Sequence, residues 1–179
     1  CRKKNYFNMI EIITLGSSSK GNCYLIKNKK AVLILEAGLP LIEVKKALDF
    51  DLSKVVGCLI THEHKDHAKY IKEYNDAGIE IIYSDYVDLS KHELHNFSAI
   101  SVKYFYSITK SVKALAVNAV HDVPCVSFLI DFYGKKIAFV TDTSKFNYKL
   151  PACDLWMIEA NYDDKFINSD VPECVINRT

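Results

Sequence analysis

The segment Thr61–Lys69 (THEHKDHAK) constrains this chain more than any other, because it gathers three of the six histidines around one aspartate. The run before it, Val55–Ile60, is short, apolar and rich in β-branched residues, which predicts a buried strand. The histidines therefore follow the carboxyl end of a strand. In extended backbone, residues two apart point the same way, so His62 and His64 can bind one ion together.

Asp66 and His67 continue this motif at the start of a helix predicted over Asp66–Tyr74, so their side chains diverge from the first pair and can reach a second ion. Neutral imidazole with carboxylate is a ligand set for zinc, manganese or iron, whereas calcium prefers oxygen alone. The alternative is a solvated, histidine-rich loop in which Asp66 stabilises the positive end of the helix. Metal binding is the favoured interpretation.

Length and composition predict one soluble domain with a single core, since the chain has 179 residues, 49% of them hydrophobic and 25% charged. No apolar run approaches the ~20 residues of a membrane span. The net charge of +1 adds nothing in favour of a nucleic-acid partner. The six cysteines form no Cys-x-x-Cys pair and no secretory signal precedes the first strand, which predicts reduced thiols in a cytoplasmic protein.

Both ends of the sequence look incomplete. Met9 opens the first alternating apolar run, so residues 1–8 are expected to be a leader or an added remnant, followed by a single domain over 9–179. The last residues, Val171–Thr179, are polar and have no helix behind them, so we expect that further chain once followed.

Hydrophobic patterns predict strands that alternate with helices early in the chain, which is typical of a sheet covered by helices. Helices are predicted at Pro40–Leu48, Asp66–Tyr74 and Asp85–His95. Strands are predicted at Ile10–Leu15, Cys23–Lys27, Ala31–Leu35, Val55–Ile60, Glu80–Tyr83, Cys125–Phe132, Lys136–Val140 and Leu155–Ile158, with further β-rich runs over 99–117. The glycine-flanked loop 16–22 has the residues for an anion-binding loop, but a hairpin connection is the favoured interpretation.

Two more polar residues, His121 and Asp142, stand where apolar strands give way to loops. Strand ends at one edge of a sheet can meet in one cleft, so both are candidate ligands beside the histidine motif. His92 and His95 lie three apart on the predicted helix but have no second carboxylate near them in the sequence. We expect them to face solvent rather than a metal.

The pattern His-x-His-x-Asp-His after a strand resembles that of the metallo-β-lactamase-fold hydrolases. The resemblance implies an αββα sandwich with helices on the outer faces of two mixed sheets. It also implies two divalent ions, with zinc first and manganese or iron as alternatives. One ion would be bound by His62, His64 and His121, and the other by Asp66, His67 and Asp142, with Asp142 between them.

Shorter pieces of the chain, Gly-Ser-Ser-Ser-Lys-Gly-Asn-Cys-Tyr, Val-His-Asp-Val-Pro and Thr-Asp-Thr, are similar to the cytosolic nuclease-like branch of that superfamily associated with bacterial cell-wall regulators. This resemblance implies a phosphodiesterase or nuclease that uses metal-activated hydroxide, with a nucleic acid or another phosphodiester as substrate and Asp66 handling a proton. Two alternatives stay open: an acyl-type hydrolase of a lactone, thioester or lactam, and a degenerate metal-binding module without turnover.

Three positions depart from the family pattern. Glu36 stands where the family has an aspartate after the third strand, and it can still accept hydrogen bonds and orient the metal loop. Tyr162 stands where the nuclease-like branch tends to have histidine. The family's last histidine ligand has no candidate after His121, so either the chain stops before it or the second site is incomplete.

Overall fold

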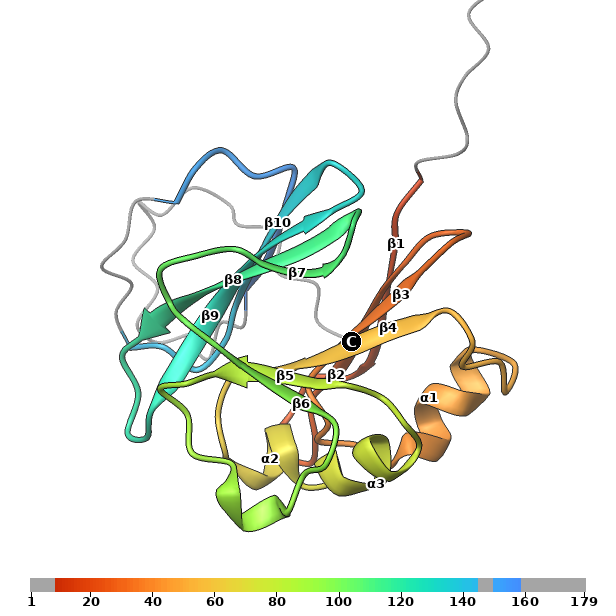
Figure 1. Ribbon diagram of the computed structural model, residues 1–179, viewed down its shortest axis with the longest axis horizontal. Coiled ribbons are helices and arrows are strands. Elements are labelled where there is room, and N and C mark those ends of the chain that lie inside the picture. The colour runs from red at the N-terminus through yellow and green to blue at the C-terminus, as the bar shows by residue number, and fades with distance from the viewer. Residues whose placement is uncertain (1–8, 145–149, 159–179) are drawn as a thin grey trace, which may run out of the picture.

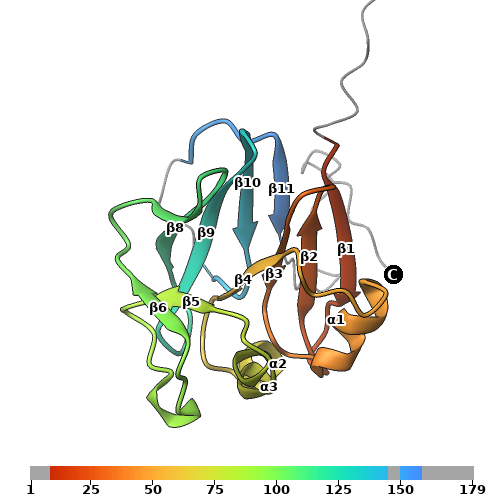
Figure 2. The same cartoon turned by 45° about the vertical axis from the view of Figure 1, so that its right-hand side comes forward.

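The computed structural model describes residues 9–144 and 150–158, which form two mixed β-sheets packed face to face (Figures 1 and 2). In the first sheet β1, β2 and β3 are antiparallel neighbours, and β3 to β6 run parallel. Its strands are, in spatial order, β1 (Glu11–Gly16), β2 (Cys23–Lys27), β3 (Val32–Leu35), β4 (Val55–Ile60), β5 (Ile81–Ser84) and β6 (Phe97–Ile100).

The second sheet is an antiparallel meander with one parallel strand added at its edge. Because β8 and β10 both pair antiparallel with β9, these two strands run in the same direction and end at the same edge of the sheet. In spatial order the strands are β11 (Leu155–Ile158), β10 (Lys135–Val140), β9 (Cys125–Phe132), β8 (Val112–Ala119) and β7 (Tyr106–Thr109).

Two apolar cores hold the layers together. One lies between the sheets, where Leu59 of the first packs with Phe128 of the second. The other lies between the first sheet and its helices, which are α1 (Leu41–Ala47), α2 (Lys65–Ala68) and α3 (Ile71–Asp76). In the described ranges, α-helices cover only this outer face of the first sheet (Figure 1).

The strand β4 belongs to both cores, which is why its sequence reads as an unbroken apolar run. The layered arrangement of two mixed sheets is the predicted one. The described helices include none long and apolar enough to cross a membrane.

The predicted strands are confirmed with shifts of a residue or two, and the β-rich stretch 99–117 is divided among β6, β7 and β8. The predictions for residues 1–8, for Tyr162 and for the polar end at Val171–Thr179 concern positions outside the described residues.

The single helix predicted over Asp66–Tyr74 is wrong, because the structure has α2 and α3 with a break at Lys69 and Tyr70. In a continuous helix the Tyr70 N–H would bond to the Asp66 carbonyl. Instead, the Tyr70 N–H donates to the Ala37 carbonyl at 2.9 Å, and the Asp66 carbonyl accepts from the Asn22 N–H at 2.7 Å. Neighbouring loops therefore take the hydrogen bonds that would have joined the two helices.

The helix predicted over Asp85–His95 is also wrong. The structure has only a short 3-10 helix, η2 (Ser90–His92), which ends at Glu93 in the left-handed conformation with φ 49°. The Asp85 N–H bonds to strand β6, and the His95 N–H bonds to the Asn75 side chain. These partners satisfy the backbone without a helix, so local propensity is overridden.

Candidate metal centre

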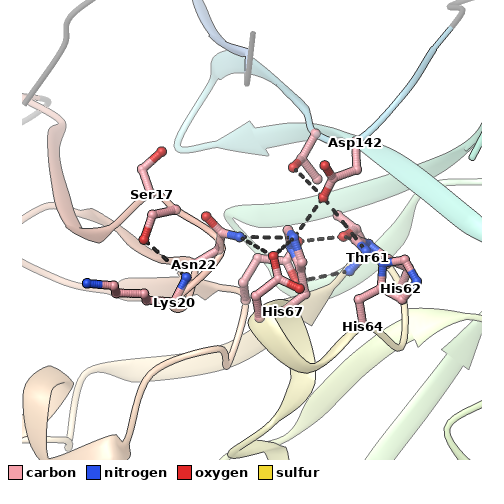
Figure 3. Close-up of polar contacts among 12 residues, drawn as sticks. Ser17, Lys20, Asn22, Thr61, His62, His64, His67 and Asp142 are labelled. Atoms are coloured by element: carbon pink, nitrogen blue, oxygen red, sulfur yellow. Dashed lines mark hydrogen bonds and ion pairs between the residues drawn. The ribbon is translucent and has the colours of Figure 1, made fainter. Parts of the chain in front are cut away.

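The histidine motif and both later candidates meet at one edge of the sandwich (Figure 3 labels His62, His64, His67 and Asp142). The motif begins two residues after β4, His121 follows β8 by two residues, and Asp142 follows β10 by two. Parallel β8 and β10 end at the same edge, so they deliver their polar residues to one place. The shared direction of β8 and β10 explains why His121 and Asp142, predicted from their places at strand ends, lie together.

The first group contains His62, His64 and His121, and one nitrogen of each lies within 4.8 Å of the others. His121 Nε2 is 3.3 Å from His64 Nδ1, and the three rings meet edge to face. His62 is buried, whereas the other two are partly exposed. The group therefore has a closed inner side and an open outer side.

The second group contains His62, His67 and Asp142, again with ligand atoms within 4.8 Å. His67 Nε2 lies 2.7 Å from Asp142 Oδ2, and His62 Nε2 lies 3.7 Å from the same oxygen. Asp66, which the resemblance places in this set, approaches it through His67, with Oδ2 3.4 Å from Nε2. His62 thus faces both groups, and Asp66 lies at the margin of the second.

The backbone is strained beside this group. Asp142 adopts φ 43°, in the left-handed region that L-residues other than glycine rarely enter. Such conformations persist only where the surrounding structure imposes them, and they cluster at functional sites. The strain marks the turn after β10 as one shaped for its side chain.

The tautomer of His62 tests whether these residues fit a cation. Thr61 donates its hydroxyl proton to Glu36 Oε1 at 2.6 Å, so its oxygen can only accept from His62 Nδ1, 2.9 Å away. His62 Nε2 is then left with a lone pair, and this buried atom has no hydrogen-bond partner among the described residues. A buried lone pair aimed at imidazoles and a carboxylate fits a divalent cation with nitrogen and oxygen ligands.

Electrostatics distinguish the two inner histidines. Burial, followed by the positive charge of His67, lowers the pKa of His62 below its ordinary value. Burial acts the same way on His67, but the carboxylates of Glu36 and Asp142 outweigh it and raise the pKa of His67. Hydrogen bonding to His67 in turn lowers the pKa of Asp142. The site therefore favours a positive charge at its centre.

Glu36 is fully buried and contacts the motif at three points. Besides the Thr61 hydroxyl, it accepts from the Thr61 N–H at 3.3 Å, and Oε1 lies 3.5 Å from His67 Nδ1. Its backbone has φ 66°, a second strained acidic residue at the site. The position expected to orient the metal loop thus contacts one ligand candidate directly and another through Thr61.

Three residues at the site were not found by sequence reasoning: Asn22, Thr61 and Asp122. Asn22 Nδ2 lies 2.9 Å from His67 Nε2, and Asp122 Oδ1 lies 3.0 Å from His121 Nε2. The adjacency of Thr61 and Asp122 to motif histidines was the only available signal for them, and the loop preceding β2 was the only signal for Asn22.

His92 and His95 belong to neither group of ligand candidates in the part of the chain that the structure describes. His95 Nδ1 lies 3.9 Å from a carboxylate oxygen of Asp76, on the surface beside α3. This surface placement is the one expected for His95. His92 differs from the expectation, because its Nε2 is buried and has no hydrogen-bond partner among the described residues.

This fold places a cluster of histidines and aspartates with the donor set of a divalent metal centre at one edge of two packed sheets. The model of the metallo-beta-lactamase superfamily matches residues 18–152, so the chain belongs to that superfamily. A search of curated protein sequences found no match.

Solved structures confirm the metallo-β-lactamase fold. The chain is similar to the metallo-beta-lactamase fold protein YhfI from Bacillus subtilis, with 15% identity, a TM-score of 0.58, and coverage of 78% of this chain and 64% of that one. A class B3 di-zinc metallo-beta-lactamase from an Alaskan soil metagenome has 19% identity, a TM-score of 0.54 and coverage of 78% and 73%. Zinc-bound PqqB from Methylobacterium extorquens has 12% identity, a TM-score of 0.57 and coverage of 75% and 64%.

The chain spans less than two thirds of the length of the first of these structures, 64% of YhfI. At such identities the likeness concerns the fold, and it does not choose among the reactions of the superfamily.

Proposed function

We propose that this chain is a metal-dependent hydrolase that cleaves phosphodiesters, in a nucleic acid or in a smaller molecule. The observation that supports it most is His62 Nε2, a buried lone pair directed at both groups of ligand candidates. Leaving such an atom unpaired costs about 1–3 kcal/mol, a cost that a bound cation removes.

The proposed ligand sets are those of the superfamily resemblance. Zinc is the first choice, because imidazole and carboxylate suit it, and manganese or iron are the alternatives. In this proposal one ion is bound by His62, His64 and His121, and the other by Asp66, His67 and Asp142. A divalent cation there supplies a nucleophile at neutral pH, since it lowers the pKa of water from about 16 to about 7.

Asp66 is the proposed proton acceptor. Its Oδ2 is held 3.4 Å from the Asn22 amide, and its side chain is partly exposed, so water can reach it. As a water oxygen attacks phosphorus, Oδ2 takes up the proton that the water loses; the P–O bond to the leaving alcohol breaks, and the alkoxide takes a proton from Asp66 or from solvent. His64 and His121 lie on the open side, where a substrate can approach.

The phosphodiester rather than the acyl substrate is proposed because the loop 16–24 and the segments around His121 and Asp142 are similar to the nuclease-like branch. The test measures zinc per chain together with cleavage of bis-p-nitrophenyl phosphate and of p-nitrophenyl acetate. We expect bound zinc and diester cleavage. His62→Ala should lose the zinc of the first site and cleavage with it, Asp66→Asn should lose cleavage, and the surface variant His95→Ala should be unchanged. Ester cleavage alone would instead favour the acyl hydrolase, and zinc without either activity the degenerate module.

A further inference from the structure

The side chain of Asn22 points into the metal centre from the loop between β1 and β2 (Figure 3). Asn22 is 1% exposed. Its Nδ2 lies 2.9 Å from His67 Nε2 and 3.4 Å from Asp66 Oδ2. An amide nitrogen carries two hydrogens and no lone pair, so both contacts use Asn22 as a donor.

Both the side chain and the backbone of Asn22 are held in place. The Asp66 carboxylate can only accept, which assigns the amide nitrogen to the metal centre and leaves Oδ1 on the outer side, 3.4 Å from the Tyr24 hydroxyl. The Asn22 N–H donates to the Asp66 carbonyl at 2.7 Å, and the Asn22 carbonyl accepts from the Gly38 N–H at 3.0 Å. The donor is therefore preorganised.

His67 Nε2 cannot satisfy everything around it. Within 3.4 Å it has one donor, Asn22 Nδ2, and two carboxylate oxygens, from Asp66 and Asp142. A single nitrogen offers either one proton or one lone pair. If His67 Nε2 is a metal ligand, as the proposed function requires, its lone pair is no longer available to Asn22. One Asn22 N–H then still donates to Asp66 Oδ2, and the other is a buried donor that needs an acceptor.

We propose that Asn22 is a substrate-binding residue of the site, donating this second N–H to an anionic oxygen of the substrate, such as a phosphoryl oxygen. The inference rests on the proposed function, because the donor is released only when His67 binds a cation. Donors aimed at the position where negative charge develops stabilise the transition state, and here burial strengthens the bond.

Inorganic phosphate is the probe, and calorimetry of the zinc-loaded chain measures its affinity. Asn22→Ala removes the donor, and we expect about tenfold weaker phosphate binding, in keeping with one hydrogen bond to a charged group. Asn22→Asp keeps the size but replaces the donor with a carboxylate. We expect it to weaken phosphate binding further while zinc binds at least as tightly. Asn28→Ala, in the next turn along the chain, is the matched control and should bind phosphate like the wild type.

The outcomes separate this inference from the proposed function. A wild-type chain that binds no zinc overturns the proposed function and this inference with it. A chain that binds zinc, whose Asn22→Ala variant binds phosphate as tightly as the wild type, overturns this inference alone. If both Asn22 variants lose zinc in proportion to phosphate, Asn22 supports only the fold of the site and the inference is again wrong. Zinc affinity and circular dichroism of each variant, recorded without phosphate, identify that last case.

Discussion

Thr61 donates its hydroxyl proton to the buried carboxylate of Glu36 across 2.6 Å. An ionised carboxylate has no proton to donate, so Thr61 is the donor in this bond, and its oxygen is left to accept from His62 Nδ1. The pair thereby sets the tautomer of the one histidine that faces both groups of ligand candidates. A hydroxyl without a charge of its own thus decides which nitrogen of His62 is presented to a cation.

Removing this hydroxyl should weaken metal binding. In Thr61→Val the shape is kept, but His62 Nδ1 loses its acceptor, and Glu36 loses its shortest hydrogen bond. Losing a partner that orients a metal ligand typically costs 10–100-fold in affinity, so we expect about that loss for zinc. Competition with a chromophoric chelator measures it.

Thr61→Ser is the matched control, because it keeps the hydroxyl and removes only a methyl group. It should restore zinc affinity to within a few-fold of the wild type, and the ring-nitrogen chemical shifts of His62 should report the same tautomer. If Thr61→Val binds zinc like Thr61→Ser, the tautomer is set by another group.

The histidines should differ in their importance for metal binding. His62 faces both groups, whereas His64 belongs to the first alone. We therefore expect His62→Ala to abolish tight zinc binding at the first site and to weaken it at the second, where His62 Nε2 lies 3.7 Å from Asp142 Oδ2, and His64→Ala to abolish it at the first only. Metal stoichiometry at low free zinc distinguishes the two. His92→Ala and His95→Ala should leave the stoichiometry unchanged, and a loss of zinc in either would contradict the assignment.

Most of the fold could be predicted from the sequence because its strands are buried and their signal is local. The run Val55–Ile60 packs in both cores and reads as an apolar strand without any knowledge of its neighbours. The helix Asp66–Tyr74 could not be predicted correctly, because its break depends on backbone bonds to Ala37 and Asn22, which are distant in sequence. The helix prediction for Asp85–His95 was wrong for the same reason, because its backbone bonds to residues distant in sequence.

The residues of the site likewise differ in how far the sequence indicates them. The dense motif indicates His62 and His64, and the strand ends indicate His121 and Asp142, because the topology brings these strand ends together. Asn22 has no such signal, because an asparagine before a strand is an ordinary turn residue. The role proposed for Asn22 rests on a tertiary contact with His67 that only the folded chain shows.

The stability of the metal-free chain should depend on pH through His62 and His67. Unfolded, both titrate near 6.5. Folded, burial and the charge of His67 lower the pKa of His62, while Glu36 and Asp142 outweigh burial and raise that of His67. Below about pH 6.5, His62 binds a proton in the unfolded chain but stays neutral in the folded chain, so stability falls as the pH falls. Above it, folded His67 keeps a proton that the unfolded chain releases, so stability falls as the pH rises.

The two histidines together should therefore give the free energy of unfolding a maximum near pH 6.5. Urea unfolding of the chelator-treated protein at a series of pH values measures it. The double variant His62→Gln, His67→Gln should lack this contribution, so the difference between the two curves isolates it. A difference that rises or falls steadily through this range would contradict the opposite shifts of the two histidines.

Gly38 should be the glycine least tolerant of a side chain. A Cβ there would lie 1.7 Å from the Asp66 carbonyl oxygen and 2.6 Å from the Asn22 nitrogen, both backbone atoms. The 2.7 Å bond between those two groups would have to break, which leaves two backbone groups unpaired beside the motif. Overpacking and the lost bond together predict a cost of roughly 3–5 kcal/mol in Gly38→Ala. Urea unfolding of the zinc-free protein measures it.

Gly78→Ala is the control, because a Cβ at Gly78 meets nothing within 4 Å and only the backbone, at φ 85°, disfavours a side chain there. That variant should cost about 1–2 kcal/mol. If the two variants are equally stable, the loops that hold Asn22 and Asp66 are free to separate, and the preorganisation argued for Asn22 is wrong.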